Sequence, residues 1–162
     1  MKKKEHLPVY GVGPVCVYLM VGLLIGGLVL RHLGLLDSGA VPGLWWLFRP
    51  LGAVLIGLGV FIWIRAVLVV RVGDSILNNE LMTGDVYGWV RNPIYSAIAM
   101  ALTGLGLLFC NLWLLLLPVL YWLDITVLMK CTEEKWLLEL YGQPYRDYCR
   151  RVNRCIPWFP KK

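Results

Sequence analysis

Histidine, paired cysteines and known hydrolase or nucleotide motifs are scarce or missing in this chain of 162 residues. The two histidines, His6 and His32, lie at opposite ends of the first apolar run, and the five cysteines contain no C-x-x-C pair. These spacings indicate neither a metal site nor a disulfide framework. No G-x-S-x-G or P-loop pattern indicates a serine hydrolase or an NTPase. We also find no internal repeat, and we predict a single domain over residues 1–162.

Charge is the next scarce feature, because only 16% of the residues are charged while 59% are hydrophobic and the mean hydropathy is +0.66. This composition is too apolar for an ordinary soluble domain and predicts a membrane protein. Residues 9–30 contain no charge over 22 positions, and about 20 residues are needed to cross the hydrocarbon core as a helix. The run is long and lacks an A-x-A-like cleavage site, so we expect a retained first span rather than a signal peptide.

Three further spans are predicted, over residues 46–69, 94–109 and 112–129. The second must hold Arg49 or Arg65 near one end, where the side chain reaches the interface. The other two come from an uncharged run of 32 residues, which is too long for one span. A tight helical hairpin turning near Cys110 and Asn111 accommodates it.

The basic residues predict the orientation of these four spans. With both termini in the cytoplasm, all of the 16 lysines and arginines except Arg31 and Arg49 lie on the cytoplasmic side. The net charge of +6 then needs no nucleic acid partner, since the anionic lipid of the cytoplasmic leaflet accounts for it. The predicted fold is all-α and polytopic, with a cytoplasmic amphipathic helical tail.

Two polar segments, residues 78–97 and 130–160, are brought to the cytoplasmic side by this topology. The first contains Arg91-Asn92-Pro93, which taken alone is a helix start with a positive anchor. The second begins with a helix over 132–140, ended by Gly142, whose apolar stripe suits a position on or against the membrane. Within it, Lys130 and Glu134 have the spacing of a weak ion pair.

Taken together, the two segments resemble the isoprenylcysteine carboxyl methyltransferase family and its phospholipid methyltransferase relatives. The resemblance rests on T-G-D-V-Y-G-W-V-R-N-P-I-Y followed by T-E-E-K-W-L-x-x-x-Y-G-x-x-Y-x-x-Y-x-x-R-V-x-R-x-I-P. It implies an S-adenosylmethionine site at the cytoplasmic end of a small helical bundle, with S-adenosylhomocysteine as product. It covers about half of the chain, and the first two spans carry no recognisable signature.

The resemblance also implies roles for individual residues. Two basic candidates and one acid are expected at the reacting acceptor: Arg91, Lys130 and Glu134. The implied cofactor-binding residues are Asn79, Glu80, Leu81, Met82, Tyr87, Asn92, Pro93, Ile94, Tyr95, Glu133 and Glu134. No residue is assigned to a metal.

Three positions depart from the family pattern. Asp85 stands where the family usually has glycine, and Ala97 stands where a glycine commonly follows the R-[HN]-P-x-Y tyrosine. The second change predicts slightly looser packing of that helix. Asn92 replaces the histidine of the prenylcysteine enzymes, which removes a titratable group from this position. The change affects the expected acceptor more than the expected cofactor, because asparagine still donates and accepts hydrogen bonds.

We therefore expect a membrane enzyme that methylates a lipophilic small acceptor, with a carboxylate as the first choice of acceptor group. Methylation of an amine in a phospholipid head group is the alternative within catalysis. A non-catalytic membrane subunit of the same fold is the alternative from another class. Asp124, an acid within the last span, is either a functional residue or a structural one, close enough to the cytoplasmic end to be hydrated or to pair with Arg65.

Overall fold

The structure is a computed structural model that describes residues 11–70 and 81–160, and these form an all-α fold of six α-helices. Four make a bundle: α1 (Gly13–His32), α2 (Trp45–Ile64), α4 (Pro93–Leu107) and α5 (Leu117–Cys131). Two short helices follow, α6 (Glu133–Tyr141) and α7 (Gln143–Arg151). The shorter elements are η1 (Asp37–Gly39), η2 (Pro42–Leu44), the π-helical η3 (Arg65–Val69), η4 (Asp85–Gly88) and η5 (Leu112–Leu116).

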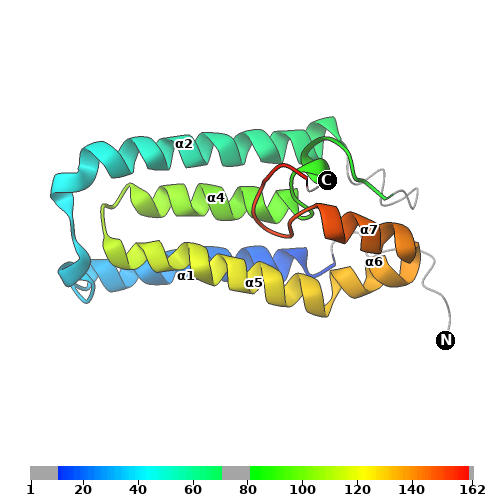
Figure 1. Ribbon diagram of the computed structural model, residues 1–162. Coiled ribbons are helices and arrows are strands. Elements are labelled where there is room, and N and C mark those ends of the chain that lie inside the picture. Colours follow the sequence, from blue (N-terminus) through cyan, green and yellow to red (C-terminus); the bar gives the residue numbers. More distant parts are fainter. Residues whose placement is uncertain (1–10, 71–80, 161–162) are drawn as a thin grey trace.

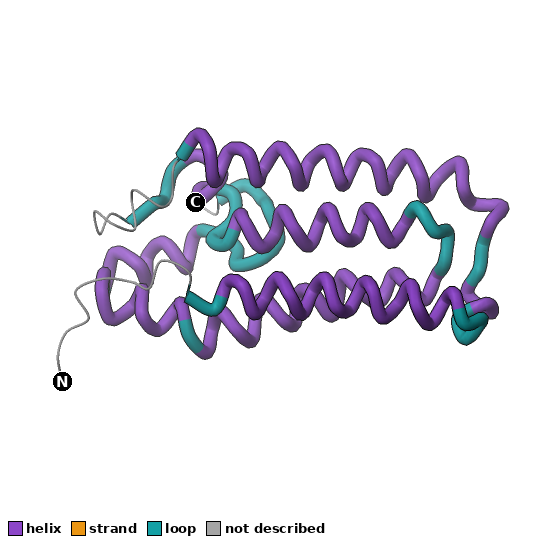
Figure 2. The backbone as a smooth tube through the Cα atoms, turned by 180° about the vertical axis from the view of Figure 1, so that it is seen from behind, coloured by secondary structure: helices purple, strands orange, loops and turns teal. Residues whose placement is uncertain are grey.

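The bundle is polarised along its length (Figures 1 and 2). The connections from α1 to α2 and from α4 to α5 lie at one end, while α6, α7, η4 and the segment after α7 gather at the other. Helix α4 packs on α2 and also contacts α1 and α5. Segments far apart in the sequence therefore meet around the first residues of α4.

Within residues 11–70 and 81–160, three helical segments are long and apolar enough to cross a membrane: Gly13–His32, Pro42–Val69 and Leu112–Cys131. They agree with three of the predicted spans to within a few residues at each end. The remaining one, α4, is apolar but has only 15 residues. Together these helices indicate an integral, multi-pass membrane protein.

Small residues allow α2 and α4 to pack closely. A Cβ atom at Gly52 would lie 2.6 Å from the carbonyl oxygen of Gly104, and one at Gly59 would lie 2.6 Å from that of Ala97. The looser packing expected at Ala97 is not found, because Gly59 on the facing helix provides the close approach. Such contacts between small residues are typical of helices that associate within lipid.

The predicted helical hairpin turns at Cys110 and Asn111, as expected. Cys110 has a positive φ of 49°, and its carbonyl oxygen accepts a hydrogen bond from Val41 N at 2.8 Å. The Asn111 side chain is buried, donates to Leu36 O at 2.8 Å and accepts from Trp113 N at 2.9 Å. One polar side chain thus joins both connections at this end of the bundle.

The core of the bundle lies between α1 and α5. Its fully buried side chains include Cys16 and Met20 from α1, and Tyr121 and Ile125 from α5. At its edge the Cys16 thiol donates a hydrogen bond to Asp124 Oδ2 at 3.3 Å. The pairing of Asp124 with Arg65 considered above is not formed, because Arg65 binds Asp85 instead.

Candidate active site

The segment before α4 is held by the segment that follows α7. Val90 and Asn153 form a parallel bridge, and Arg91 N donates to Asn153 O at 2.8 Å. Next to it, Asn92 Nδ2 donates to Arg154 O at 3.1 Å. Because Pro93 then begins α4 without an N–H to satisfy, the backbone can change here from extended to helical. The Arg91-Asn92-Pro93 motif is therefore fixed by contacts about 60 residues away in sequence.

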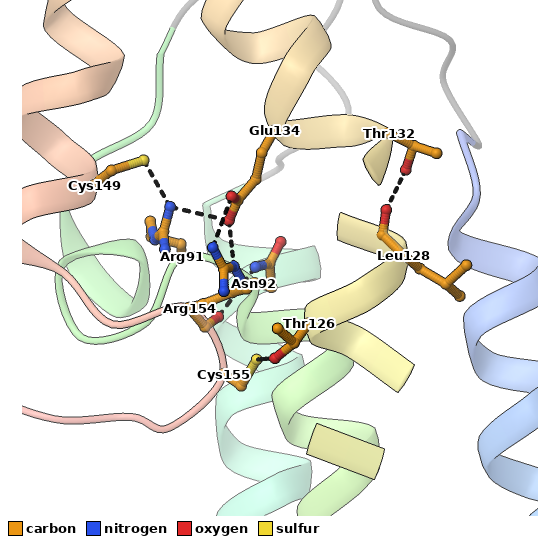
Figure 3. A network of polar contacts seen from close by, with 9 residues as sticks. All are labelled: Arg91, Asn92, Thr126, Leu128, Thr132, Glu134, Cys149, Arg154 and Cys155. Atoms are coloured by element: carbon orange, nitrogen blue, oxygen red, sulfur yellow. Dashed lines mark hydrogen bonds and ion pairs between the residues drawn. The ribbon is translucent and has the colours of Figure 1, made fainter. Parts of the chain in front are cut away.

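Glu134 lies at the centre of a charged network at this end of the bundle (Figure 3). Its Oε1 atom lies 3.0 Å from Arg91 NH1 and 2.6 Å from Arg154 Nε, and its Oε2 atom accepts from Arg154 NH2 at 2.9 Å. Arg154 thus binds the carboxylate with two nitrogens, the strongest geometry for this pair. The three side chains come from the loop before α4, from α6 and from the segment after α7.

Arg91 retains an unused donor within this network. Its side chain is 9% exposed, and Arg91 Nε is buried without a hydrogen-bond partner among the described residues. Arg91 NH1 also donates to the Cys149 sulfur at 2.6 Å. Two guanidinium groups against one carboxylate give this cluster a net charge of +1. A buried donor without a partner is costly, so the cluster is suited to receive an anionic or polar group.

Glu133 faces a different group of residues from its neighbour, since successive helical residues point about 100° apart. The Tyr95 hydroxyl donates to Glu133 Oε1 at 3.1 Å, and the backbone N–H of Val12 donates to the same carboxylate. Burial raises the pKa of Glu133 above its usual value, while these two hydrogen bonds act in the opposite direction. The acidic pair is thus divided between two environments, one of them rich in arginine.

Several of the predicted cofactor residues also come together beside the network. Met82, Tyr87 and Ile94 pack in one apolar cluster with Ala66 and Val86. Leu81 packs with a second cluster that contains Tyr145 and Tyr148, and Pro93 is fully buried. The Tyr148 hydroxyl donates to the Tyr87 carbonyl oxygen at 2.7 Å, which joins α7 to η4. Asn79 and Glu80 lie outside the described residues.

Lys130 is placed differently from Arg91. It is exposed in the last turn of α5, and the ion pair with Glu134 considered above is replaced by the pairs that Glu134 makes with Arg91 and Arg154. The apolar stripe of α6 also has a partner within the protein, because Leu137 and Tyr141 pack with the tyrosines of α7. Its expected position against the membrane is therefore taken in part by α7.

Three groups that contact the predicted site residues were not themselves predicted: Arg154, Cys149 and the Val12 backbone. A signal existed for Arg154, which is the second arginine of the R-V-x-R-x-I-P element. Nothing in the sequence pattern pointed to Cys149 or to Val12, whose contacts depend on how α7 and α1 pack.

Asp85, which replaces the usual glycine, adopts the left-handed backbone conformation that favours glycine, with a φ of 53°. Its carboxylate binds Arg65 of η3 and accepts a hydrogen bond from Val86 N at 2.7 Å. The hydrogen bond from Arg65 lowers the pKa of Asp85. Aspartate therefore keeps the conformation of the glycine and adds a link between the end of α2 and η4.

One of three comparisons with known proteins gives a match. The sequence profile of the family described as phospholipid methyltransferase matches residues 47–144, well over half of the chain. This match spans nearly all of α2 and the whole of α4, α5 and α6, and it leaves α1, most of α7 and the segment after α7 outside. No curated protein and no solved structure gives a significant match. The chain belongs to the phospholipid methyltransferase family and is an S-adenosylmethionine-dependent methyltransferase of the membrane.

Proposed function

We propose that this enzyme methylates a lipophilic, membrane-partitioned acceptor at the charged end of its helical bundle. The observation that carries the proposal is the network of Arg91, Glu134 and Arg154, which joins two polar segments that are distant in sequence. The neighbouring contact between Tyr95 and Glu133 adds a second link between the same segments. Both arise at the first turn of α4, where a membrane helix meets polar backbone.

The residues present fit S-adenosylmethionine, whose methionyl end carries an ammonium and a carboxylate group beside the sulfonium. The net positive charge of the Arg91, Glu134 and Arg154 network suits the carboxylate of the cofactor, and Glu133 is an acceptor for its ammonium group. Met82, Tyr87 and Ile94 form an apolar wall beside these charges. We therefore assign the cofactor to the described members of the predicted set: Leu81, Met82, Tyr87, Asn92, Pro93, Ile94, Tyr95, Glu133 and Glu134.

When bound, S-adenosylmethionine supplies an electrophilic methyl group, so the chain needs neither a nucleophilic side chain nor a metal. A carboxylate acceptor is already a nucleophile at neutral pH. The work of the protein is then to orient the acceptor, an effect that reaches about 7 to 11 kcal/mol in well-aligned reactions. Arg91 carries the unused donor and is the residue that we place at the acceptor carboxylate. Lys130 is the second basic candidate, at the exposed end of α5.

A second acceptor, the amine of a phospholipid head group, is favoured by a different observation. Glu133 is a partly buried acid whose pKa is raised by burial, so in this alternative its carboxylate is a stronger base toward the ammonium group than that of an exposed glutamate. The name of the family also points to a phospholipid. The carboxylate and amine proposals share one site and differ in the atom that receives the methyl group.

We further propose that α4 crosses the membrane as a fourth, short span and that both termini lie in the cytoplasm. The support is the positive-inside bias of the loops and the position of α4 alongside the longer α2. This orientation places the charged network at the cytoplasmic interface, where the cofactor has access.

Transfer of a radiolabelled methyl group from S-adenosylmethionine to a membrane lipid extract tests the proposal. Methyl esters are cleaved by mild base and release volatile methanol, whereas N-methyl groups are stable, so base treatment identifies the acceptor atom. The matched control pair is Glu134→Gln and Glu139→Gln, since Glu139 is exposed on the same helix. We expect only Glu134→Gln to reduce transfer. Equal activity of the two variants would remove Glu134 from the site.

A further inference from the structure

The first turn of α1 packs against the side chains of Tyr95 and Glu133, although α1 lies outside the residues matched by the family. The Val12 backbone N–H donates to the Glu133 carboxylate. Gly13 is buried beside the Tyr95 ring, where an added Cβ atom would lie 2.5 Å from the Tyr95 hydroxyl oxygen. At Gly11 the added atom would lie 2.8 Å from Glu133 Oε1. The space at this turn is therefore set by two side chains of the proposed site.

The same face of α1 continues to follow α5 into the bundle. Cys16 is three residues after Gly13 and so lies on the same face of the helix. Its thiol donates to Asp124 Oδ2 at 3.3 Å, and Met20, one turn further on, is fully buried in the core between α1 and α5. These contacts fix the position of α1 along the bundle axis, which makes the approach of Gly13 to Tyr95 a defined feature of the packing.

We propose that Gly13 is a positioning residue of the methyltransferase: by leaving room for the Tyr95 hydroxyl, it lets Tyr95 hold Glu133 in place for the cofactor. The inference rests on the function proposed above and extends the site to α1. Val12 acts with it through its backbone N–H. The first helix is then part of the site as well as a membrane span.

Among the described residues, a single atom, the Tyr95 hydroxyl oxygen, lies too close for a side chain at position 13. The nearest ring carbons of Tyr95, Cε1 and Cζ, would lie 3.4 Å from the added Cβ, which a small movement accommodates. The hydroxyl oxygen at 2.5 Å, at the far end of the Tyr95 side chain, has to shift, and we expect this shift to break its hydrogen bond to Glu133. Removing that oxygen should therefore remove the conflict.

Four variants of the full-length protein in detergent test the proposal: Gly13→Ala, Tyr95→Phe, their combination, and Gly22→Ala. Gly22 is the matched control, because it lies in the same helix and an added Cβ atom there meets none of the described residues within 4 Å. The dissociation constant for S-adenosylmethionine is measured by calorimetry. The free energy of unfolding of each protein, without ligand, is measured in parallel as a readout that does not depend on the function.

We expect Gly13→Ala to raise the dissociation constant by about tenfold, the change that accompanies loss of one hydrogen bond to a charged group. Gly22→Ala should bind as the wild type does. The combined variant should bind no more weakly than Tyr95→Phe alone, and the two changes should be non-additive in unfolding as well. If Gly13→Ala acted only through the structure of α1, it would change binding and unfolding equally in the wild type and in Tyr95→Phe.

Two results would overturn the positioning role of Gly13 independently of the proposed function. One is equal binding by Gly13→Ala and Gly22→Ala, with wild-type binding intact, which leaves the proposed function standing and removes Gly13 from it. The other is additivity of Gly13→Ala and Tyr95→Phe in unfolding, which means that the two residues do not meet. If the wild type binds no cofactor, the proposed function fails, and with it the positioning role, whatever the unfolding data show.

Discussion

Arg154 binds Glu134 through two nitrogens, at 2.6 Å from Nε to Oε1 and 2.9 Å from NH2 to Oε2. This pair links the segment after α7 to α6, and it raises the pKa of Arg154 above its usual value, mainly through the hydrogen bond to Glu134. Because Arg91 shares the same carboxylate, the pair also determines where Arg91 can place its unused donor.

Arg154→Lys should therefore reduce methyl transfer while keeping the charge, because an ammonium group cannot reproduce the two parallel hydrogen bonds of a guanidinium. We expect a loss of about 1.5 to 3 kcal/mol in transition-state stabilisation, the range for a hydrogen bond to a charged group. The ratio of kcat/KM values measures it. Arg150→Lys is the matched control, since Arg150 is exposed and pairs only with Asp147 among the described residues. A similar loss in both variants would contradict the role of Arg154.

Glu133→Gln should change how stability depends on pH. The folded pKa of Glu133 is raised above 4.5 by burial, so the folded state holds this proton more tightly than the unfolded state does. Its contribution to stability is therefore full below about pH 4.5 and is lost as the pH rises through the folded pKa. Because glutamine does not titrate, Glu133→Gln should gain stability relative to the wild type as the pH rises through this folded pKa.

Unfolding of both proteins between pH 4 and 8 checks this prediction, with the difference between them as the quantity of interest. Taking the difference cancels groups that both proteins share, such as Asp85, whose pKa is lowered. A difference that stays constant across the range would show that Glu133 titrates as it does in the unfolded chain.

Gly104→Ala should destabilise the bundle, because the added Cβ atom would lie 2.5 Å from the carbonyl oxygen of Gly52 and the two helices would have to separate. Overpacking of this kind costs about 1 to 3 kcal/mol. Gly57→Ala is the control in the same pair of helices, since its added atom meets no atom of the described part of the chain within 4 Å. Thermal unfolding in detergent compares them, and equal midpoints would contradict the close contact between α2 and α4.

Asp85→Ala and Asp85→Gly both remove the ion pair with Arg65 but differ in what the backbone tolerates. At a φ of 53°, alanine is strained and glycine is not, so Asp85→Ala should be the less stable variant by about 1 kcal/mol. The exposed ion pair itself should contribute little. Comparison of the two unfolding free energies tests the left-handed conformation, and the reverse order of stability would exclude it.

Much of the fold follows from hydropathy and charge alone. The uncharged runs located α1, α2, α4 and α5 and the turn at Cys110 because a bilayer imposes its thickness on the sequence. Gly142 ends α6 as expected, with a positive φ of 61°. These features could be predicted because hydropathy and helix ends depend on residues that are close together in the sequence.

The candidate site was predictable only in part, because its contacts join segments that are distant in sequence. The motifs identified Arg91, Tyr95, Glu133 and Glu134 as one group, yet not which arginine each acid would meet. Lys130 had the better local spacing to Glu134, but α7 and its following segment carry Arg154 to the carboxylate instead. The contribution of α1 had no motif at all, since it arises from a glycine that leaves room for another residue.

Calorimetric titration of the purified protein with S-adenosylmethionine tests the central claim most directly, with Glu134→Gln and Glu139→Gln measured beside the wild type. We expect wild type and Glu139→Gln to bind with equal affinity and Glu134→Gln to bind more weakly. Failure of the folded wild type to bind, or full binding by Glu134→Gln, would contradict a cofactor site at the network of Arg91, Glu134 and Arg154.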